Sequence, residues 1–268
     1  MFIVRGSCPR LRRGHLRLFI MKYFLIALQF LTRIPVKIKD KIEDRDYGYS
    51  MAWFPVVGLI LGWILALVFK LTVLVVNPAI AVVLVITIYM FLTGALHIDG
   101  LSDACDGLYG GKGDKVKTLE IMKDSRIGTV GALALVLDIS LRCALLYSLP
   151  ASRIPASLIL MAVLGRWSQV LFSLNVPSAR AESRGGYFSS SLTPGIFGFS
   201  SMTMFGICLF LLKPVSLILL VLFLILIIQL AKNYFRRKIG GITGDAIGAV
   251  NEITEILVLF WFSSVLLS

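Results

Sequence analysis

The chain has 268 residues, of which 57% are hydrophobic and only 16% are charged. This apolar share exceeds the roughly 45–50% of an average soluble domain, and the mean hydropathy is +0.88. Several apolar runs approach the about 20 residues needed to cross a hydrocarbon core about 30 Å thick. These values exclude an ordinary soluble enzyme and predict an all-α, polytopic membrane protein.

The formal net charge of +12 would also suit a nucleic-acid-binding protein. The basic residues, however, lie at the ends of apolar runs. That placement is typical of the positive-inside rule and of attraction to anionic lipid. We therefore expect contact with membrane lipid and no nucleic-acid partner.

The first 20 residues are basic and contain no acidic residue. They lack a sustained apolar core and a small-residue cleavage site, so we expect an N-terminal extension rather than a cleaved signal peptide. A translation start at Met21 is an alternative explanation. Residues 21–36 are apolar but short, which predicts an interfacial or re-entrant helix. Residues 37–50 carry mixed charges and should be solvated, and residues 21–268 should form a single membrane-embedded catalytic domain.

Hydropathy predicts about seven membrane-spanning helices. Their expected positions are 51–69, 79–96, 129–149, 156–175, 195–212, 214–231 and 247–267. If the N-terminus lies inside, the inner connecting segments hold most of the basic residues, whereas the three outer segments hold one each (Lys70, Arg153 and Lys213). This asymmetry predicts a protein of the cell (inner) membrane with a cytoplasmic N-terminus and an external C-terminus.

Three polar, glycine-containing loops (97–128, 176–195 and 232–246) then fall on the cytoplasmic side. A carrier usually binds its substrate near the bilayer midplane, on broken helices. Here the polar residues gather at one membrane face, which favours an enzyme that takes a soluble substrate from the cytosol. We expect the three loops to form one site together.

Three aspartates of the first loop, Asp99, Asp103 and Asp106, have the spacing i, i+4, i+7. On a helix this spacing places them on one face, where they repel unless a cation offsets their charge. Carboxylate oxygens suit Mg²⁺ or Mn²⁺, which often bridge to substrate phosphates. A solvated helix end is the alternative. His97 could orient a ligand or transfer a proton, or it could be an ordinary interfacial histidine.

A short amphipathic helix is expected at residues 114–123. Its inward-facing residues should be Val116, Leu119 and Met122. The segment that follows contains Lys123, Asp124, Ser125 and Arg126. Such a mixture of cations and a carboxylate suits a phosphoryl group, although the two cations could instead extend toward the membrane interface.

Another carboxylate stripe lies in GGITGDAIGAVNEITE, residues 240–255, where Asp245, Glu252 and Glu255 share one helical face. Carboxylates within a membrane are costly and normally face a partner, a cavity or an ion. They could complete a metal site, or they could pair with Arg166 in the fourth predicted span.

Two further groups of charges remain. Arg180 and Arg184 lie in the 176–195 loop, where they could provide counter-charge to a diphosphate. Asp138 and Arg142 are spaced i, i+4 within the third predicted span, which predicts a buried ion pair.

Taken together, these residues indicate phosphoryl or nucleotidyl transfer at a membrane face. In such a reaction a metal neutralises a diphosphate while a carboxylate or histidine deprotonates an attacking hydroxyl. The competing class is an ion- or proton-coupled transporter, with Asp138, Glu252 and Glu255 as relay groups.

Several long motifs carry a family resemblance, namely HIDGLSDACDG, EIMKDSRIGTVG, GGITGDAIGAVNEITE, QFLTRIPV and GRWSQVLFSLNVPSAR. With them the chain resembles the cobalamin synthase family, the adenosylcobinamide-GDP ribazoletransferases, from about Met21 to the C-terminus. The resemblance implies that a ribose hydroxyl of α-ribazole, or of its 5′-phosphate, attacks adenosylcobinamide-GDP. Adenosylcobalamin (or its 5′-phosphate) and GMP would form, with Mg²⁺ required.

Residue roles follow as hypotheses. Mg²⁺ should be held by Asp99, Asp103 and Asp106, with Asp245 or Glu252 completing the shell. The candidate general bases are Asp124 and His97. The substrate-binding residues should be Lys123, Ser125, Arg126, Arg166, Arg180 and Glu255. The substrates are small molecules, and a homo-oligomer stays open.

Overall fold

The computed structural model describes residues 13–180 and 184–264. Within these residues the extended regular elements are all helices, and the sole β-type pairing is an isolated parallel bridge between Ser178 and Ile242. The predicted all-α fold is therefore confirmed.

The elements are named in chain order. They are α1 (Arg13–Leu31), α2 (Asp44–Ser50), the 3₁₀ turn η1 (Met51–Trp53), α3 (Phe54–Thr72), α4 (Pro78–Thr93), α5 (Leu96–Gly110), α6 (Lys115–Ile121), α7 (Thr129–Ser148), α8 (Ile154–Ser173), α9 (Arg184–Ser191), α10 (Pro194–Leu209), α11 (Pro214–Ile239) and α12 (Gly244–Ser263).

In the described part of the chain, 5 helical segments are long and apolar enough to cross a membrane. These segments are Asp44–Thr72, α7, α8, α11 and α12. The pair α4 and α5 makes a sixth if it counts as one span, although it is bent by 88°. The expected count of seven is not confirmed, because α4 and α10 have only 16 residues each. A helix of that length measures about 24 Å, which is shorter than the hydrocarbon core.

The N-terminal part differs from expectation at its boundaries. The helix predicted over 21–36 already ends at Leu31, and residues 37–50 are not wholly irregular because α2 forms in their second half. A capping box between Glu43 and Asp46 starts α2 by satisfying free backbone N–H groups at its first turn. The extension predicted over 1–20 lies mostly outside the described residues.

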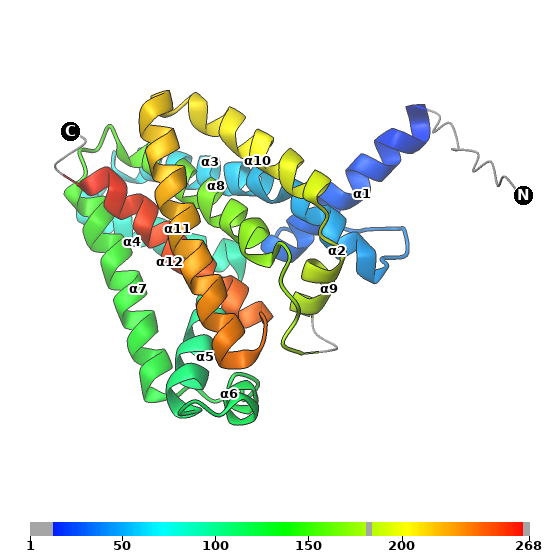
Figure 1. Cartoon of the computed structure of the whole chain (residues 1–268). Coiled ribbons are helices and arrows are strands. Elements are labelled where there is room, and N and C mark those ends of the chain that lie inside the picture. The colour runs from blue at the N-terminus through cyan, green and yellow to red at the C-terminus, as the bar shows by residue number, and fades with distance from the viewer. Residues whose placement is uncertain (1–12, 181–183, 265–268) are drawn as a thin grey trace, which may run out of the picture.

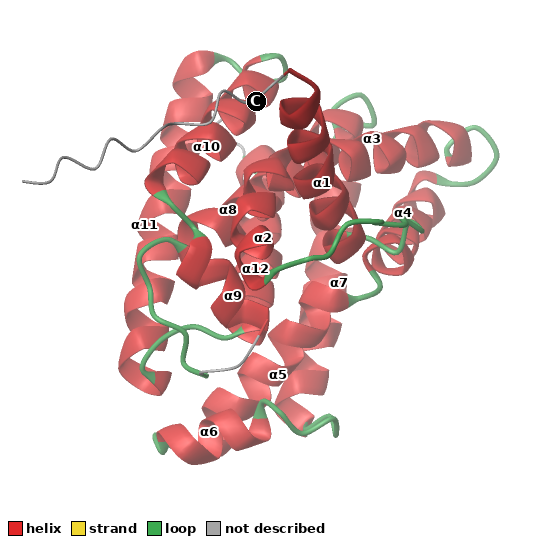
Figure 2. Cartoon of the chain, turned by 90° about the vertical axis from the view of Figure 1, so that its right-hand side faces the viewer, coloured by secondary structure: helices red, strands yellow, loops and turns green. Residues whose placement is uncertain are grey.

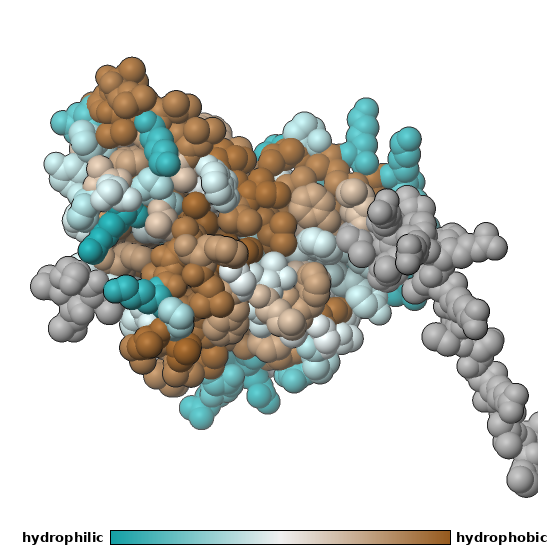
Figure 3. Space-filling model, turned by 90° about the horizontal axis from the view of Figure 1, so that it is seen from above, coloured by the Kyte–Doolittle hydropathy of each residue, from teal (hydrophilic) through white to brown (hydrophobic). Residues whose placement is uncertain are grey.

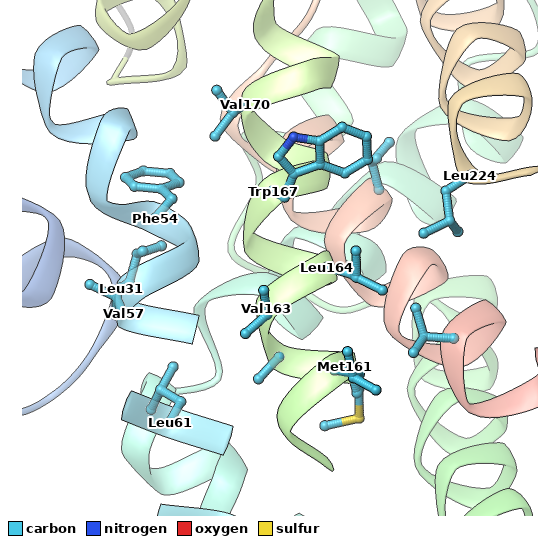
Figure 4. Close-up of a cluster of buried hydrophobic side chains, with 14 of the residues drawn as sticks. Leu31, Phe54, Val57, Leu61, Met161, Val163, Leu164, Trp167, Val170 and Leu224 are labelled. Carbon is cyan, nitrogen blue, oxygen red and sulfur yellow. The ribbon is translucent and has the colours of Figure 1, made fainter. Parts of the chain in front are cut away.

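The core of the molecule is built around α8, in which nearly every residue is buried. Helix α3 packs on one side, and a Cβ at its Gly58 would lie 2.5 Å from the carbonyl oxygen of Ala162. Figure 4 shows Val163 and Val170 of α8 on the side of α3, with Leu164 on the opposite side. Glycine on α3 thus permits two backbones to approach closely, as in membrane helix pairs.

Two spans leave most of their surface outside the core. Only 22% of the α7 window and 28% of the α11 window are buried. Figure 3 shows apolar residues spread widely over the face seen from above. Apolar surface of this extent is expected where lipid tails rather than water surround a helix.

The polar connections gather at one end of the bundle, where Figures 1 and 2 place α5 and α6. Helix α6 packs on α5 through Thr118 and Met122, which fit against Gly107 and Gly111. The prediction that Val116 faces inward is wrong, since its side chain is 65% exposed. Thr118 and Met122 are spaced i, i+4 and face the two glycines. Val116, two residues before Thr118, therefore lies on the opposite side of the helix and points outward.

Candidate functional site

The site begins where α5 crosses α12. A Cβ added at Gly100 would lie 3.0 Å from the Cα of Asp245, and one added at Gly248 would lie 2.9 Å from the carbonyl oxygen of His97. A side chain at Gly100 or Gly248 would therefore push the two helices apart. The close approach brings the first turn of α12 against the aspartate face of α5.

The connection after α8 is attached to the connection before α12. Ile242 donates to the carbonyl oxygen of Pro177 and accepts from the backbone of Ala179, at 3.0 and 2.9 Å. This pairing positions Arg180, whose Nη1 lies 3.4 Å from Asp245 Oδ2. Arg180 Nη2 also donates to the carbonyl oxygen of Leu119 in α6 at 3.0 Å. Arg180 therefore contacts both of the other predicted polar loops.

A cavity of about 220 Å³ opens at this junction. Its polar wall includes His97, Asp99, Gln169, Arg180 and Asp245. Its apolar wall includes Phe30, Met51, Phe54 and Phe188. The ring centroids of Phe30 and Phe188 lie 4.6 Å apart, so the aromatic side chains of this wall contact one another.

Of the three aspartates of α5, Asp99 lines the cavity, whereas Asp103 and Asp106 do not. Asp103 is half-buried and interacts electrostatically with Asp99, Asp106 and Asp245, whereas Arg180 is the cation that acts on it. Four carboxylates near one guanidinium leave an excess of negative charge, which a bound cation would offset.

The residues present can be compared with what Mg²⁺ requires. The donors are hard oxygens, and the buried Oδ2 of Asp245 accepts no hydrogen bond. No three acidic, histidine or cysteine side chains in the described ranges are arranged as a ready-made metal cage. Mg²⁺ commonly uses only one or two carboxylates together with water and substrate phosphates. One or two carboxylates among Asp99, Asp103 and Asp245 therefore fit a partial site that a phosphorylated substrate would complete.

Asp106 faces away toward the start of α7. Its Oδ2 accepts from the backbone of Gly128 at 2.7 Å, and its Oδ1 accepts from that of Gly131 at 2.8 Å. A Cβ at Gly131 would lie 2.2 Å from this carboxylate, so the contact needs glycine there. Asp106 thus caps α7 from a neighbouring helix, and its metal role stays a prediction.

The four residues predicted between α6 and α7 do not line the cavity. Lys123, Ser125 and Arg126 are exposed, and Arg126 Nη2 lies 2.5 Å from Asp124 Oδ2. Hydrogen bonds from the side chain and backbone of Arg126 lower the pKa of Asp124 to about 2. These two charges satisfy each other at the surface, and their roles as base and phosphate ligand stay predictions.

A second polar cluster is buried in the bundle, behind the cavity. The fully buried Arg142 donates to Asp138 at 2.7 Å and to Glu252 at 2.6 Å, and it also pairs with Glu255. The predicted ion pair between Asp138 and Arg142 is therefore confirmed.

Arg166 belongs to the same cluster. Its Nη1 donates to Glu255 at 2.8 Å and to Asn251 at 2.6 Å, while the Tyr89 hydroxyl donates to Glu255 at 2.5 Å. The expected alternative, in which Arg166 pairs with a carboxylate of the last span, is thus confirmed. None of Arg166, Glu252 and Glu255 lines the cavity, so the structure does not join them to the aspartates of α5.

Two amides that were not among the predicted site residues connect this cluster to the cavity. Gln169 Nε2 lies 3.0 Å from His97 Nε2 and donates to Asn251 Oδ1 at 2.8 Å. Polar side chains inside apolar spans are a signal that could have revealed both residues. The phenylalanine wall carried no such signal, since isolated aromatic residues are ordinary in membrane helices.

Comparisons with known proteins agree with the early resemblance. The family model for cobalamin-5-phosphate synthase matches residues 23–263. An adenosylcobinamide-GDP ribazoletransferase of Clostridium tetani is 38% identical over 92% of this chain and 99% of its own length. Proteins of the same name from Clostridium novyi and Acinetobacter baumannii are 37% and 38% identical, over 89% and 90% of this chain and 95% and 97% of their own lengths.

No solved structure matches the chain. The family match spans all described helices from α2 to α12, including every residue placed at the cavity. The chain belongs to the cobalamin-5-phosphate synthase family.

Proposed function

We propose that this chain is a Mg²⁺-dependent adenosylcobinamide-GDP ribazoletransferase of the membrane, acting late in cobalamin synthesis. The names of relatives that align over nearly their whole length support this activity. The observation that carries the proposal is that Asp99, Asp245 and Arg180 line one cavity, while Asp103 interacts with all three through its charge. That set suits a diphosphate together with a divalent cation.

The reaction joins a ribose hydroxyl of α-ribazole, or of its 5′-phosphate, to the cobinamide-side phosphorus of adenosylcobinamide-GDP. A phosphorus–oxygen bond forms to the ribose, and the bond from that phosphorus to the bridging oxygen breaks. GMP leaves with the bridging oxygen, and the hydroxyl proton passes to a base. Two phosphoryl groups must therefore be held beside a hydroxyl nucleophile.

The side chains of the polar wall divide this work. Arg180 contacts the backbone of α6 and the carboxylate of Asp245. Because its guanidinium is already positioned, it can bind substrate phosphate oxygens at a small cost in side-chain entropy. Asp99, Asp103 and Asp245 are the residues that would hold Mg²⁺ beside the diphosphate. When bound, Mg²⁺ would neutralise the diphosphate and stabilise the leaving phosphate.

The apolar wall suits the flat base of ribazole. Phe30, Phe54 and Phe188 offer ring faces and edges for stacking in the cavity that the charged groups also line. A cavity of about 220 Å³ is smaller than the roughly 300–1,000 Å³ of drug-sized pockets. It therefore takes the nucleoside, while the bulky corrinoid stays at the mouth.

We assign the cavity end of the bundle to the cytoplasm. Basic residues of α6 and of the last turn of α11 gather there, including Lys115, Lys117, Arg236 and Arg237. This agrees with the positive-inside rule. The external C-terminus depends on an odd number of crossings and stays a prediction.

The test is conversion of adenosylcobinamide-GDP and α-ribazole by purified full-length protein, followed by chromatography of GMP and the corrinoid product. We expect product with Mg²⁺ and none after chelation. Asp245→Asn and Asp103→Ala should lower the rate at ordinary Mg²⁺, whereas the exposed-site control Asp40→Asn should not. Folded protein without product would refute the transferase, and full activity under chelation would refute the metal requirement.

A separate measurement distinguishes the transporter. Asp138, Glu252 and Glu255 are held by two buried arginines rather than lining the cavity. Protein in closed vesicles should therefore form product without any ion gradient. Movement of a corrinoid or ion without product formation would favour the transporter instead.

A further inference from the structure

The amides between the buried cluster and His97 form a chain of hydrogen bonds with a fixed direction. It runs from Arg166 through Asn251 and Gln169 to His97 Nε2, with heavy-atom distances of 2.6, 2.8 and 3.0 Å. All four side chains are buried. Each hydrogen bond needs one donor and one acceptor. The direction of the bond between Arg166 and Asn251 therefore determines the direction of the next two.

Arg166 sets that polarity because a guanidinium only donates. Asn251 must turn its oxygen toward Arg166, and its Nδ2 then donates to Glu252 and Glu255, each at 2.9 Å. A flipped Asn251 amide would place N–H groups against the arginine and an oxygen against two carboxylates. The orientation of Asn251 is therefore fixed from both sides.

The orientation of Asn251 determines the orientation of the Gln169 amide. Its Nε2 faces the Asn251 oxygen and must donate there, and the second hydrogen of the same nitrogen points to His97. In this orientation Gln169 Oε1 is buried without a partner. If the Gln169 amide were flipped, its Oε1 would face the oxygen of Asn251 and its NH₂ group would be buried without a partner. The two hydrogen bonds of Gln169 Nε2 would be replaced by a single hydrogen bond from His97 and a repulsion between two oxygens.

His97 Nε2 must then accept a hydrogen bond, so a neutral ring carries its hydrogen on Nδ1. No hydrogen bond from the described residues occupies Nδ1, and His97 is among the residues that line the cavity. Nδ1–H is therefore the ring position left for a substrate.

We propose that Gln169 and Asn251 are positioning residues that hold His97 in the Nδ1–H tautomer. His97 then serves as a hydrogen-bond donor to a phosphoryl oxygen and not as the general base. The donor role rests on the proposed function. The tautomer does not, because it follows from the hydrogen-bond chain alone.

The tautomer can be read directly by nitrogen NMR of protein labelled with ¹⁵N-histidine. The chain has only two histidines, His15 and His97, so His15→Gln leaves a single ring. We expect Nε2 to be unprotonated and Nδ1 to carry the hydrogen at neutral pH. Gln169→Met removes the donor and should raise the share of the Nε2–H form. Gln229→Met, at an exposed glutamine of α11, should leave it unchanged.

Activity separates a donor from a base. The side-chain nitrogen of asparagine can occupy the position of Nδ1, but an amide cannot accept a proton at physiological pH. We expect His97→Asn to stay within about tenfold of the unmodified rate, whereas His97→Ala should lose roughly 10²-fold, as when one donor to developing negative charge is removed.

Two results would overturn the proposal. One is a spectrum of the His15→Gln protein in which Nε2 carries the hydrogen, a result that needs no folded Gln169 variant. The other is equal loss of activity in His97→Asn and His97→Ala, by the roughly 10²–10⁴-fold expected for a missing base. If no variant and no unmodified protein forms product, the proposed function fails while the NMR result still decides the tautomer.

Discussion

Replacing Arg142 by methionine tests whether the buried cluster is organised as the structure shows. Its guanidinium serves Asp138, Glu252 and Glu255 at once and is fully buried. Removing one partner of a buried pair typically costs about 3–5 kcal/mol, because the remaining charge has neither water nor a counter-ion. Arg142→Met leaves three carboxylates with Arg166 alone, so we expect a loss of at least that size in the free energy of unfolding.

Asp138 provides a way to separate charge from packing. Within the described residues its side-chain hydrogen bonds all come from Arg142, whereas both glutamates have other partners. Asp138→Asn alone should cost only about 1.5–3 kcal/mol, the usual value of a charged hydrogen bond. Combined with Arg142→Met it removes the isolated carboxylate. The double variant should then be more stable than the sum of the single effects predicts, by about 0.5–3 kcal/mol.

The measurement is equilibrium unfolding in mixed micelles, followed by tryptophan fluorescence. Arg153→Met, at an exposed arginine beside α8, is the control and should change the free energy by no more than about 0.5 kcal/mol. Strictly additive effects, or an Arg142→Met protein as stable as the control, would contradict the buried cluster.

Three smaller predictions concern single contacts. Gly131→Ala should lower the free energy of unfolding by about 1–3 kcal/mol because its Cβ would overlap a carboxylate, while Gly198→Ala, with no atom within 4 Å, should be neutral or slightly stabilising in the same assay. Arg180→Gln should raise KM about 10- to 150-fold by removing charged hydrogen bonds, and Arg126→Gln should change KM much less in parallel assays. Lys232→Met should destabilise the protein by about 1–3 kcal/mol, because it removes two 3.0 Å bonds to the last carbonyls of α8.

The sequence predicts the long spans well and the bent one poorly. The spans expected at 129–149 and 156–175 are found as α7 and α8 with ends shifted by at most two residues. The span expected at 79–96 is found as α4, but it ends at Thr93, and the next helix is bent by 88° from it. Gly94 and Ala95 adopt positive φ values of 63° and 56° there. A sum of hydropathies does not register such a turn, and a left-handed alanine is rare enough that local pattern would not suggest it.

The site was predictable where its contacts are local along the chain. Spacing alone identified the shared face of Asp99 and Asp103 and the pairing of Asp138 with Arg142, because i, i+4 neighbours meet on any helix. Spacing could not tell that Arg126 would bind Asp124 on the surface and leave the cavity to other residues. Contacts between distant segments depend on which backbones can approach, and that is decided by tertiary packing.

The buried cluster also explains why α12 presents Asp245 to the cavity. Rotating a helix by one residue turns each side chain by about 100°, which would move Asp245 off the α5 face. Glu252 and Glu255 lie on the same stripe of α12 and are bound by Arg142 and Arg166 from α7 and α8. These ion pairs therefore fix the rotation of the helix whose first turn enters the site. Arg142→Met should for this reason weaken substrate binding even in the fraction that remains folded, a result that a purely stabilising arginine would not produce.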